Sequence, residues 1–334
     1  MTLKAAVYRK YGPSDVLGIE AVAKPEPGDG EVLVRIHMTT VCAGDVRFRK
    51  ADPFFLRLLN GLLRPKRINI LGMEFAGTIE KIGRKVKRFA EGDRVFGSTG
   101  FRFGTYAEYA CLPQDGLVAI RPDAVTAEDA AAVPFGGISA LYFLRRGGIA
   151  RGQKVLVYGA SGSVGTFAVQ LAKHFGAHVT GVCGTANLEL VRSLGADEAI
   201  DYTREDFAEL GRAYDIIFDT VGKSGFWRSM ESLKRGGSYV MAASIPAAAT
   251  LKSMMIGLLS PTLGSAWVSI TGAGKVVGGV ARGNVRDLSF LMGLIETGDI
   301  RPVIDRTYPL DGIAEAHRYV EQGHKRGNVV IAVD

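Results

Sequence analysis

Residues 154–173 have the sequence KVLVYGASGSVGTFAVQLAK, in which an apolar run is followed by a glycine-rich turn and then by apolar residues at helical spacing. The run Lys154–Tyr158 shows no polar–apolar alternation, which predicts a strand in a parallel sheet covered on both faces. A helix is expected from Val164, with Gly176 placed to end it. Together with the apolar residues 177–183, this stretch predicts a βαβ unit.

The turn has the pattern A-x-G-x-x-G, a variant of the dinucleotide-binding fingerprint. A helix N-terminus offers free N–H groups and about half a positive charge, which attract an anion such as phosphate. Gly162 has no Cβ to keep a phosphate from the backbone, and Gly165 permits close packing of helix and strand. A glycine triplet alone can be a tight turn that binds nothing, but the flanking strands and helix favour a pyrophosphate site.

Length and composition indicate an ordinary globular protein of about two domains, with 334 residues, 47% of them hydrophobic and 22% charged. The three cysteines are far apart and form no C-x-x-C pair, which favours a reducing compartment, and we expect the cytoplasm. The formal net charge of +7 is spread along the chain, so nucleic acid is not an expected partner.

Two segments bear on membranes. The N-terminus, MTLKAAVYRKYG, lacks the apolar core of a signal peptide. Residues 253–274 are uncharged and long enough to span a bilayer, but their proline, glycines and hydroxyl side chains favour a core or interface segment. We therefore expect no membrane span.

The first part of the chain is expected to be mostly β. Short strands between Gly/Pro turns are predicted at residues 4–8, 31–40, 75–82, 94–96 and 106–111. Between them, residues 52–70 predict one or two short helices that carry Phe54, Phe55, Leu56, Leu58, Leu59, Leu62 and Leu63. These apolar side chains form either a local core or an apolar wall or lid over a substrate site.

The periodicity changes near Thr126, which is expected to cap a helix reaching Val133. Residues 134–137 interrupt it, and a helix resumes at 138–145. Strands at 179–183, 198–201, 214–219 and 238–243 then alternate with helices at 187–194 and 226–233, which predicts a doubly wound parallel sheet. Helices at 287–297 and 311–322, a strand near Val303 and a strand at 328–333 follow; this last strand is expected to return to the first domain.

The chain resembles the medium-chain dehydrogenase/reductase superfamily over essentially its whole length, and within it the zinc-free quinone oxidoreductase branch. The matching segments are LGMEFAGTIEKIG at 71–83, EGDRVFG at 91–97, TYAEY at 105–109, AAAVPFGGISALYFL at 130–144, VLVYGASGSVGTFAVQLAKHFGAHV at 155–179, LGADEAIDY at 194–202 and YDIIFDTVG at 214–222.

The resemblance implies an α/β fold with a Rossmann doubly wound parallel sheet and a GroES-like, mostly β catalytic domain. Residues 1–124 and 279–334 would form the GroES-like domain, and residues 125–278 the Rossmann domain. The resemblance also implies an NAD(P)H site in the cleft between the domains, and a homodimer.

Zinc is not expected. Cys42, in VCAGD, stands where zinc alcohol dehydrogenases of this superfamily have their first cysteine ligand, but their histidine position is Met73 and their later cysteine position is Phe135. A thioether and a phenyl ring cannot replace an imidazole and a thiolate on Zn²⁺. Cys42 is then a small buried apolar residue, and Glu74 is expected to form a structural ion pair with Arg94.

NADPH is the expected cofactor, with NADH possible. The end of the second Rossmann strand, residues 182–187, has no carboxylate to select NADH, and the first acid is Glu189. Ala186 and Asn187 stand where relatives often have Lys or Arg, which weakens the positive clamp on a 2′-phosphate.

By the resemblance, the expected cofactor-binding residues are Ser139, Ser161, Gly162, Ser163, Val164, Thr185, Asn187, Tyr202, Thr220, Val221, Gly222, Ala243 and Arg326. Tyr202 has an alternative role as a tyrosine packed on the sheet edge.

The implied reaction is hydride transfer to a quinone, an enone or a related conjugated carbonyl, and the apolar segments suggest a bulky apolar substrate. Asp45 is the one catalytic candidate, with a helix cap as its alternative role, and the five histidines include no obvious catalytic group. The asparagine that many quinone reductases have near Cys42 is absent here. Two other classes stay open: a non-catalytic NADPH-binding redox sensor or structural protein, and a methyltransferase with a similar glycine-rich turn.

Overall fold

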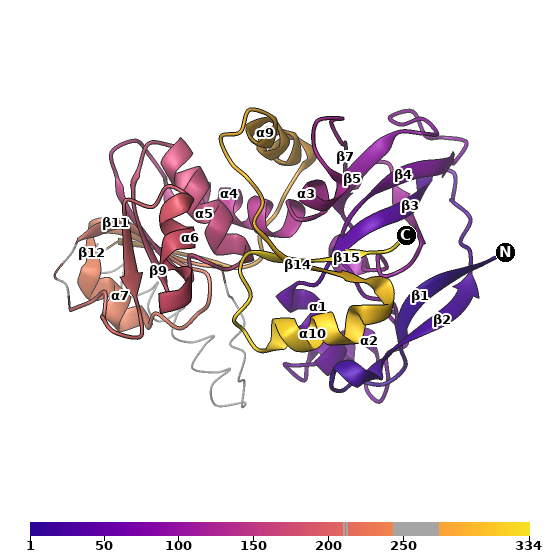
Figure 1. Cartoon of the computed structure of the whole chain (residues 1–334), viewed down its shortest axis with the longest axis horizontal. Coiled ribbons are helices and arrows are strands. Elements are labelled where there is room, and N and C mark those ends of the chain that lie inside the picture. The colour runs from indigo at the N-terminus through magenta and orange to yellow at the C-terminus, as the bar shows by residue number, and fades with distance from the viewer. Residues whose placement is uncertain (210, 212, 243–273) are drawn as a thin grey trace. The chain divides into compact units, whose positions relative to one another are not determined.

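The computed structural model of the chain describes residues 1–209, 211, 213–242 and 274–334 (Figure 1). The chain forms two compact units: unit 1 comprises Met1–Phe135 with Asn284–Asp334, and unit 2 comprises Gly136–Gly283. The expected cofactor residue Ala243, and nearly all of the uncharged segment 253–274, lie outside the described residues.

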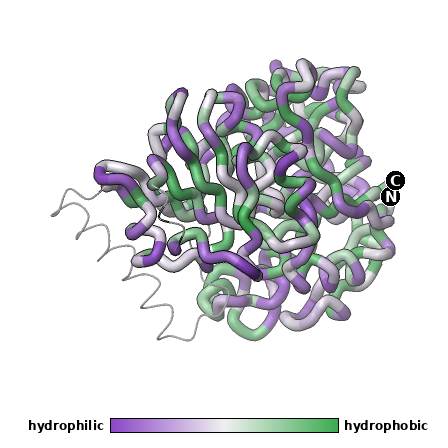
Figure 2. The backbone as a smooth tube through the Cα atoms, turned by 60° about the vertical axis from the view of Figure 1, so that its left-hand side comes forward, coloured by the Kyte–Doolittle hydropathy of each residue, from purple (hydrophilic) through white to green (hydrophobic). Residues whose placement is uncertain are grey.

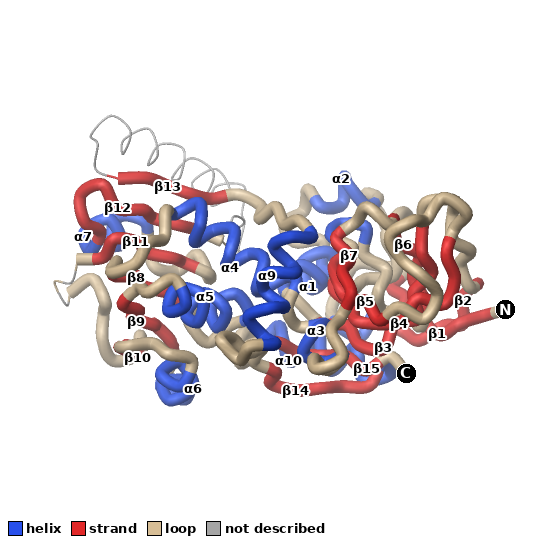
Figure 3. The backbone as a smooth tube through the Cα atoms, turned by 90° about the horizontal axis from the view of Figure 1, so that it is seen from above, coloured by secondary structure: helices blue, strands red, loops and turns tan. Residues whose placement is uncertain are grey.

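Unit 2 contains a six-stranded sheet in which all neighbouring strands are parallel, in the order β10-β9-β8-β11-β12-β13 (Figure 3). The strands are β8 (Lys154–Tyr158), β9 (His178–Cys183), β10 (Glu198–Asp201), β11 (Tyr214–Asp219), β12 (Leu233–Met241) and β13 (Gly274–Gly278). In chain order the arrangement is 3-2-1-4-5-6, the doubly wound order of dinucleotide-binding folds. The predicted α/β class is therefore confirmed.

The helices before and between these strands are α3 (Ala127–Ala131), α4 (Pro134–Gly147), α5 (Ser163–His174), α6 (Leu188–Ser193) and α7 (Phe226–Ser232). Of these, α3 belongs to unit 1, and all of α4 but its first two residues belongs to unit 2 with α5, α6 and α7. The Thr126 side chain caps α3 by accepting from the Asp129 backbone N–H, as predicted. The predicted interruption over residues 134–137 is wrong, because α4 begins at Pro134, whose fixed φ and missing donor suit a first helical turn.

Unit 1 is mostly β. Its larger sheet has the order β14-β15-β3-β4-β5-β7, with β6 also paired to β3, and β1 and β2 form a separate antiparallel ribbon. The strands are β1 (Thr2–Tyr8), β2 (Leu17–Ala23), β3 (Glu31–Thr40), β4 (Glu74–Ile82), β5 (Arg94–Ser98), β6 (Tyr109–Pro113), β7 (Leu117–Ile120), β14 (Ile304–Pro309) and β15 (Asn328–Ala332). Its further helices are α1 (Ala43–Lys50), α2 (Leu56–Asn60), α9 (Val285–Glu296) and α10 (Ile313–Glu321).

The end of the chain joins the sheet formed near its start. β15 pairs antiparallel with β3, so in Figure 1 the yellow C-terminal strand lies beside a violet N-terminal one. This pairing confirms the predicted return of the C-terminus to the first part of the chain.

Within the described residues, three strands were not predicted, and two were displaced. β12, predicted at 238–243, is observed at Leu233–Met241, so it begins at the last position of the predicted helix 226–233. β2 and β7 carry exposed side chains at their edges, and β13 is a five-residue strand with glycine at both ends, so none has a strong apolar signal. β6 begins at Tyr109 rather than at residue 106, because Tyr106 is buried under β1 and its backbone oxygen accepts from Ala6 N–H.

Apolar side chains of the sheets form the cores. The core of unit 1 gathers residues such as Val34, Phe75 and Ile331 from three neighbouring strands, and that of unit 2 includes Leu156 and Ile217. Figure 2 shows hydrophobic and hydrophilic residues interspersed along the described chain. Within that part of the chain, no helix is long and apolar enough to cross a membrane.

Candidate functional site

Three loops meet where β8, β9 and β11 end in unit 2. The Thr220 hydroxyl, after β11, donates to the backbone oxygen of Tyr158 at 2.9 Å. The Asn187 amide nitrogen, after β9, donates to the Ser161 hydroxyl at 3.1 Å. Because β8 and β11 are the neighbours at which the strand order reverses, these loops surround the topological switch point, where open α/β sheets bind ligands.

The glycines of the turn have different structural roles. A Cβ on Gly165 would lie 2.1 Å from the Gly159 backbone oxygen, so only glycine lets α5 pack this closely on the turn. A Cβ on Gly162 would meet nothing nearer than that same oxygen, at 3.5 Å, so this position is open. Gly162 is the N-cap of α5 and its backbone is extended. The first N–H groups of a helix lack acceptors within the helix, which is the general reason that anions bind at this end.

Residues 220–224 are ordered by one buried carboxylate that sequence reasoning did not single out. Asp219 accepts from the backbone N–H of Val221 and Gly222 through one oxygen, at 2.8 and 2.7 Å. Its other oxygen accepts from the N–H and the hydroxyl of Ser224, at 3.0 and 2.6 Å. An Asp that ends a buried strand and precedes a turn is a recognisable Asx-turn signal, so the segment YDIIFDTVG contained this information.

A second carboxylate corrects the expectation that no acid lies at the end of β9. Asp201 is the last residue of β10 and pairs in register with Cys183, so it lies beside the end of β9 although it is 18 positions later in the sequence. It accepts from the Thr185 hydroxyl at 2.5 Å and from the Thr203 hydroxyl at 2.7 Å, and these hydrogen bonds lower its pKa. The Thr185 hydroxyl therefore donates within the protein, and the carboxylate is occupied by protein donors.

The other expected cofactor residues in unit 2 lie around the same edge. Tyr202 is exposed and its ring lies over Gly184, next to a cavity of about 300 Å³ that includes Tyr158, Val182, Thr203 and Arg228 among its lining residues. Ser163 and Val164 form the first turn of α5. Ser139 is half-buried on α4, one turn beyond Gly136, which packs against Ser163.

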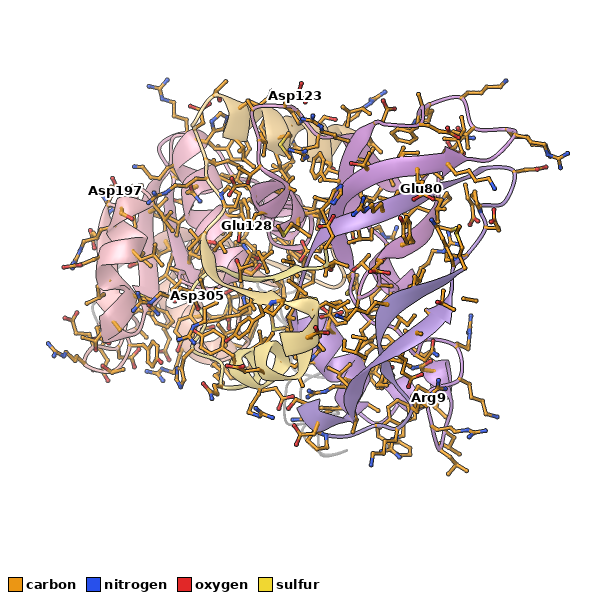
Figure 4. All side chains as sticks on the ribbon, turned by 45° about the vertical axis from the view of Figure 1, so that its right-hand side comes forward. Arg9, Glu80, Asp123, Glu128, Asp197 and Asp305 are labelled. Carbon is orange, nitrogen blue, oxygen red and sulfur yellow. The ribbon has the colours of Figure 1, made fainter. Side chains whose placement is uncertain are left out.

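Arg326 belongs to unit 1, in the loop before β15. Its backbone N–H donates to the Asp305 carboxylate at 2.9 Å (Asp305 is labelled in Figure 4), and its side chain is exposed. The described unit 2 candidates thus lie together at one edge of the unit 2 sheet. Arg326 is part of the other unit.

Asp45 is completely buried at the start of α1. One carboxylate oxygen accepts from Cys42 N–H and the other from Gly72 N–H, both at 2.9 Å, which is the geometry of a helix cap. Burial raises the pKa of Asp45 to about 6. The alternative role named for Asp45, a cap, is the one that these contacts describe, and a role in catalysis stays a prediction.

Glu74 is also buried, and its expected partner is wrong. Its oxygens accept from the Phe135 N–H at 2.6 Å and from the Thr40 hydroxyl, whereas Arg94 pairs with Asp123, which Figure 4 labels. Burial is the main cause that raises the pKa of Glu74 to about 7.

Lys325 contributes a cation to this region of unit 1. Its ammonium donates to the Gly327 backbone oxygen, and it interacts electrostatically with Cys42, Glu74 and Asp305. Some of the side chain is exposed, but the protein around the ammonium lowers the pKa of Lys325 to about 8 by desolvation. Sequence reasoning did not identify this lysine, because it is 251 positions after Glu74 in the chain.

The groups around Cys42 do not fit a zinc site. The Cys42 sulfur lies 3.8 Å from the Met73 sulfur, and burial, with the nearby Asp45 and Glu74 charges, raises the pKa of the thiol well above its ordinary value. A neutral thiol, a thioether and a carboxylate already bonded to protein donors are not the thiolate and imidazole ligands that zinc prefers. Within the described ranges, no cluster of three or more His, Cys, Asp or Glu side chains is arranged to hold a metal ion.

Comparison with known proteins defines the class. Residues 28–122 match the family described as alcohol dehydrogenase GroES-like domain, and residues 194–331 match the family described as zinc-binding dehydrogenase. The chain is 33% identical to 2-methylene-furan-3-one reductase of Solanum lycopersicum and 31% identical to the chloroplastic NADPH-dependent alkenal/one oxidoreductase of Arabidopsis thaliana. Each alignment covers 98% of this chain and 79% of the relative.

Among solved structures, the quinone oxidoreductase from Coxiella burnetii superposes with a TM-score of 0.88, at 28% identity and with 100% of both chains covered. The fold and the relatives thus define a nicotinamide-dependent oxidoreductase. The chain belongs to the medium-chain dehydrogenase/reductase superfamily, in its quinone oxidoreductase-like branch.

We predict that Gly162→Ala weakens NADPH binding by about tenfold or more, equivalent to about 1.4 kcal/mol. The added Cβ would occupy the open face of the turn, while the free energy of unfolding should change by less than about 1 kcal/mol because the position is uncrowded. Calorimetric titration with NADPH and a thermal melt measure the two effects.

Gly165→Ala is the matched control: its Cβ clashes with backbone, so it should cost about 2 kcal/mol or more of stability. Unchanged NADPH affinity in Gly162→Ala would rule out the turn as the pyrophosphate site.

We also predict that Glu74→Gln stabilises the protein at pH 8 by about 1–3 kcal/mol. The raised pKa means that wild-type stability falls as pH rises from 4.5 to about 7, since only the unfolded state loses the Glu74 proton readily in that window. Glutamine can accept from Phe135 N–H and donate to Thr40 without ionising, so its stability should vary less with pH. Urea unfolding from pH 4 to pH 8 measures how the stability of each protein varies with pH.

Glu74→Leu is the control, and it is expected to lose about 1–3 kcal/mol of stability at pH 5 because the Phe135 N–H and the Thr40 hydroxyl lose their acceptor. Equal pH profiles for wild type and Glu74→Gln would contradict the prediction.

Proposed function

We propose that this protein reduces a quinone, an enone or a related conjugated carbonyl with NADPH as the hydride donor. The observation that supports this most directly is the open turn at Gly162, in a chain aligned over 98% of its length with enone and alkenal reductases. For an enone, a hydride adds to the β-carbon and a proton to the α-carbon, which yields the saturated carbonyl.

In this proposal the turn holds the cofactor through its backbone. Ser161, Gly162, Ser163 and Val164 would surround the pyrophosphate, with N–H groups at the start of α5 as donors, and the bound nicotinamide supplies the hydride. Gly162 would leave room for the phosphates, since its own N–H donates to the Gly159 backbone oxygen at 3.1 Å. The loop that Asp219 orders, with Thr220, Val221 and Gly222, would position the nicotinamide half together with Ser139, and Ala243 is proposed to join them. The protein's contribution is thus orientation and a fixed set of hydrogen-bond donors.

NADPH is proposed over NADH. Thr185, Asn187, Tyr202 and Arg326 are the proposed contacts of the adenosine 2′-phosphate. Asp201 lies beside this end of β9, and its oxygens already accept from protein hydroxyls, so it is a poor acceptor for a ribose 2′-OH. The cavity next to Tyr202 is lined by both acids and cations, among which Arg204 pairs with Asp201 and Arg228 with Asp206.

The proposed reaction needs no zinc, because the groups at Cys42 do not match zinc's preferred ligands. We further propose that residues 1–124 and 279–334 act as the GroES-like catalytic domain and residues 125–278 as the Rossmann domain. A cytoplasmic location and a homodimer complete the proposal; the Arabidopsis relative is chloroplastic by name.

A non-catalytic NADPH-binding protein of the same fold is not favoured, because the relatives reported above are named as reductases and oxidoreductases. The methyltransferase alternative is set aside by membership of the dehydrogenase family.

We expect the purified protein to oxidise NADPH in the presence of an α,β-unsaturated ketone or a quinone, and to keep its activity after incubation with a metal chelator. Loss of NADPH absorbance over a panel of enones, quinones and saturated ketones measures this, with the saturated ketones as the matched control. Activity lost on chelation and restored by Zn²⁺ would contradict zinc independence. Tight NADPH binding with no turnover on any acceptor would contradict the enzymatic proposal.

We expect Ala186→Arg to raise the ratio of kcat/KM for NADPH over NADH by about tenfold, since a guanidinium at this exposed position would pair with the 2′-phosphate. Steady-state kinetics with both cofactors gives the ratio. Ala186→Gln is the control of similar reach without charge. A ratio that stays at the wild-type value in Ala186→Arg would argue against a 2′-phosphate at the end of β9.

A further inference from the structure

An exposed apolar cluster lies on one short segment of unit 1. Fourteen large hydrophobic side chains of the described chain are exposed, and six of them fall within ten consecutive positions. The six are Phe54, Phe55, Leu58, Leu59, Leu62 and Leu63, which flank or lie within α2 and the loop after it (Figure 1). Leu58 is 72% exposed and Leu63 is 88% exposed, so the local-core alternative is wrong for these residues, and only Leu56 of the predicted set is buried.

Buried hydrogen bonds hold this segment in its outward conformation. Asn60 is 1% exposed; its amide nitrogen donates to the Tyr8 hydroxyl at 2.8 Å and to the Ile68 backbone oxygen at 2.9 Å. Its amide oxygen accepts from the Ile68 N–H at 2.7 Å, and the Tyr11 hydroxyl donates to the Gly61 backbone oxygen at 2.8 Å. The apolar side chains are therefore presented to the outside by a fixed backbone, which is unusual for residues that gain by burial.

The same segment is cationic. Residues 53–67, PFFLRLLNGLLRPKR, contain four basic residues, and no acid occurs from 53 to 73. Arg64, Lys66 and Arg67 are exposed at the end of the segment, and the Arg57 guanidinium lies over the rings of Tyr11 and Phe54. We call residues 53–67 the basic apolar loop.

We propose that the basic apolar loop docks on the surface of an anionic phospholipid bilayer. Its exposed Phe and Leu side chains would enter the boundary between headgroups and acyl chains, and its Arg and Lys side chains would face the lipid phosphates. Clustered apolar side chains beside basic ones are the composition of interfacial segments that lie on membranes, and each basic residue near such a surface adds about 1 kcal/mol of attraction. The contact is peripheral and needs no spanning helix.

A second copy of the chain fits this surface less well. An isologous contact would place the loop against itself, so Arg64, Lys66 and Arg67 would face the same cations of the other copy with no acid within the loop to pair them. A protein partner would have to supply acids that pair with Arg64, Lys66 and Arg67 together with an apolar surface shaped to the side chains between them. A fluid hydrocarbon boundary requires no such matching.

The experiment is co-sedimentation of the full-length protein with vesicles. We expect binding to vesicles of three parts phosphatidylcholine to one part phosphatidylglycerol, and at least about tenfold weaker binding to pure phosphatidylcholine or in high salt. The variant Leu58→Ser/Leu63→Ser should reduce binding by about tenfold or more, as should Arg64→Gln/Lys66→Gln/Arg67→Gln. Thermal melts check that each variant is folded.

Two matched variants serve as controls. Ile120→Ser/Val280→Ser removes exposed apolar side chains elsewhere on the described chain, and Lys81→Gln/Arg84→Gln/Lys85→Gln removes exposed cations from another loop; both should bind as wild type. Absence of wild-type binding to anionic vesicles overturns the proposal. The proposal is also overturned if Leu58→Ser/Leu63→Ser binds vesicles as tightly as the wild type. A raised KM for apolar substrates in that variant would then assign the loop to a substrate lid, and a changed oligomeric state would assign it to self-association.

Discussion

The contact between the first turn of α5 and the turn after β8 is the constraint on which unit 2 depends. A side chain at Gly165 would lie 2.1 Å from the Gly159 backbone oxygen, so the two backbones meet only because glycine is there. This contact sets where the N-terminus of α5 lies, at the carboxyl edge of a parallel sheet. The site is therefore made from backbone position more than from side-chain chemistry, and Gly162 keeps its face open.

Carboxylates then fix the loops around that turn. Asp219 accepts from four backbone or hydroxyl donors of residues 221–224, and Asp201 accepts from the hydroxyls of Thr185 and Thr203. Both acids accept from neutral donors inside the protein, and Asp201 also pairs with Arg204, so their hydrogen-bonding capacity is used within the protein. The same arrangement leaves the rim of the turn ready for an anionic ligand with little reorganisation, which is the advantage of a preorganised site.

Unit 1 uses buried charge differently. Asp45 and Glu74 are held by backbone N–H groups and by Thr40, and burial raises the pKa of both. Around Cys42 the structure thus has protonatable groups and Lys325 instead of a thiolate–imidazole set. Such buried groups reduce stability, and proteins keep them where position matters more than stability.

The sequence by itself determined the features that depend on local spacing. Strands 31–40, 198–201 and 214–219 were predicted within their observed bounds, and so was the Thr126 cap, because hydrophobic periodicity and turn chemistry involve residues close in the chain. The tertiary structure alone decided which distant groups meet. It brought Asp201 beside Thr185 and Lys325 into electrostatic range of Glu74, paired Arg94 with Asp123, and left Leu58 and Leu63 outside the core. The physical reason is that strand register and long-range packing set these contacts, and neither is written in the spacing of neighbouring residues.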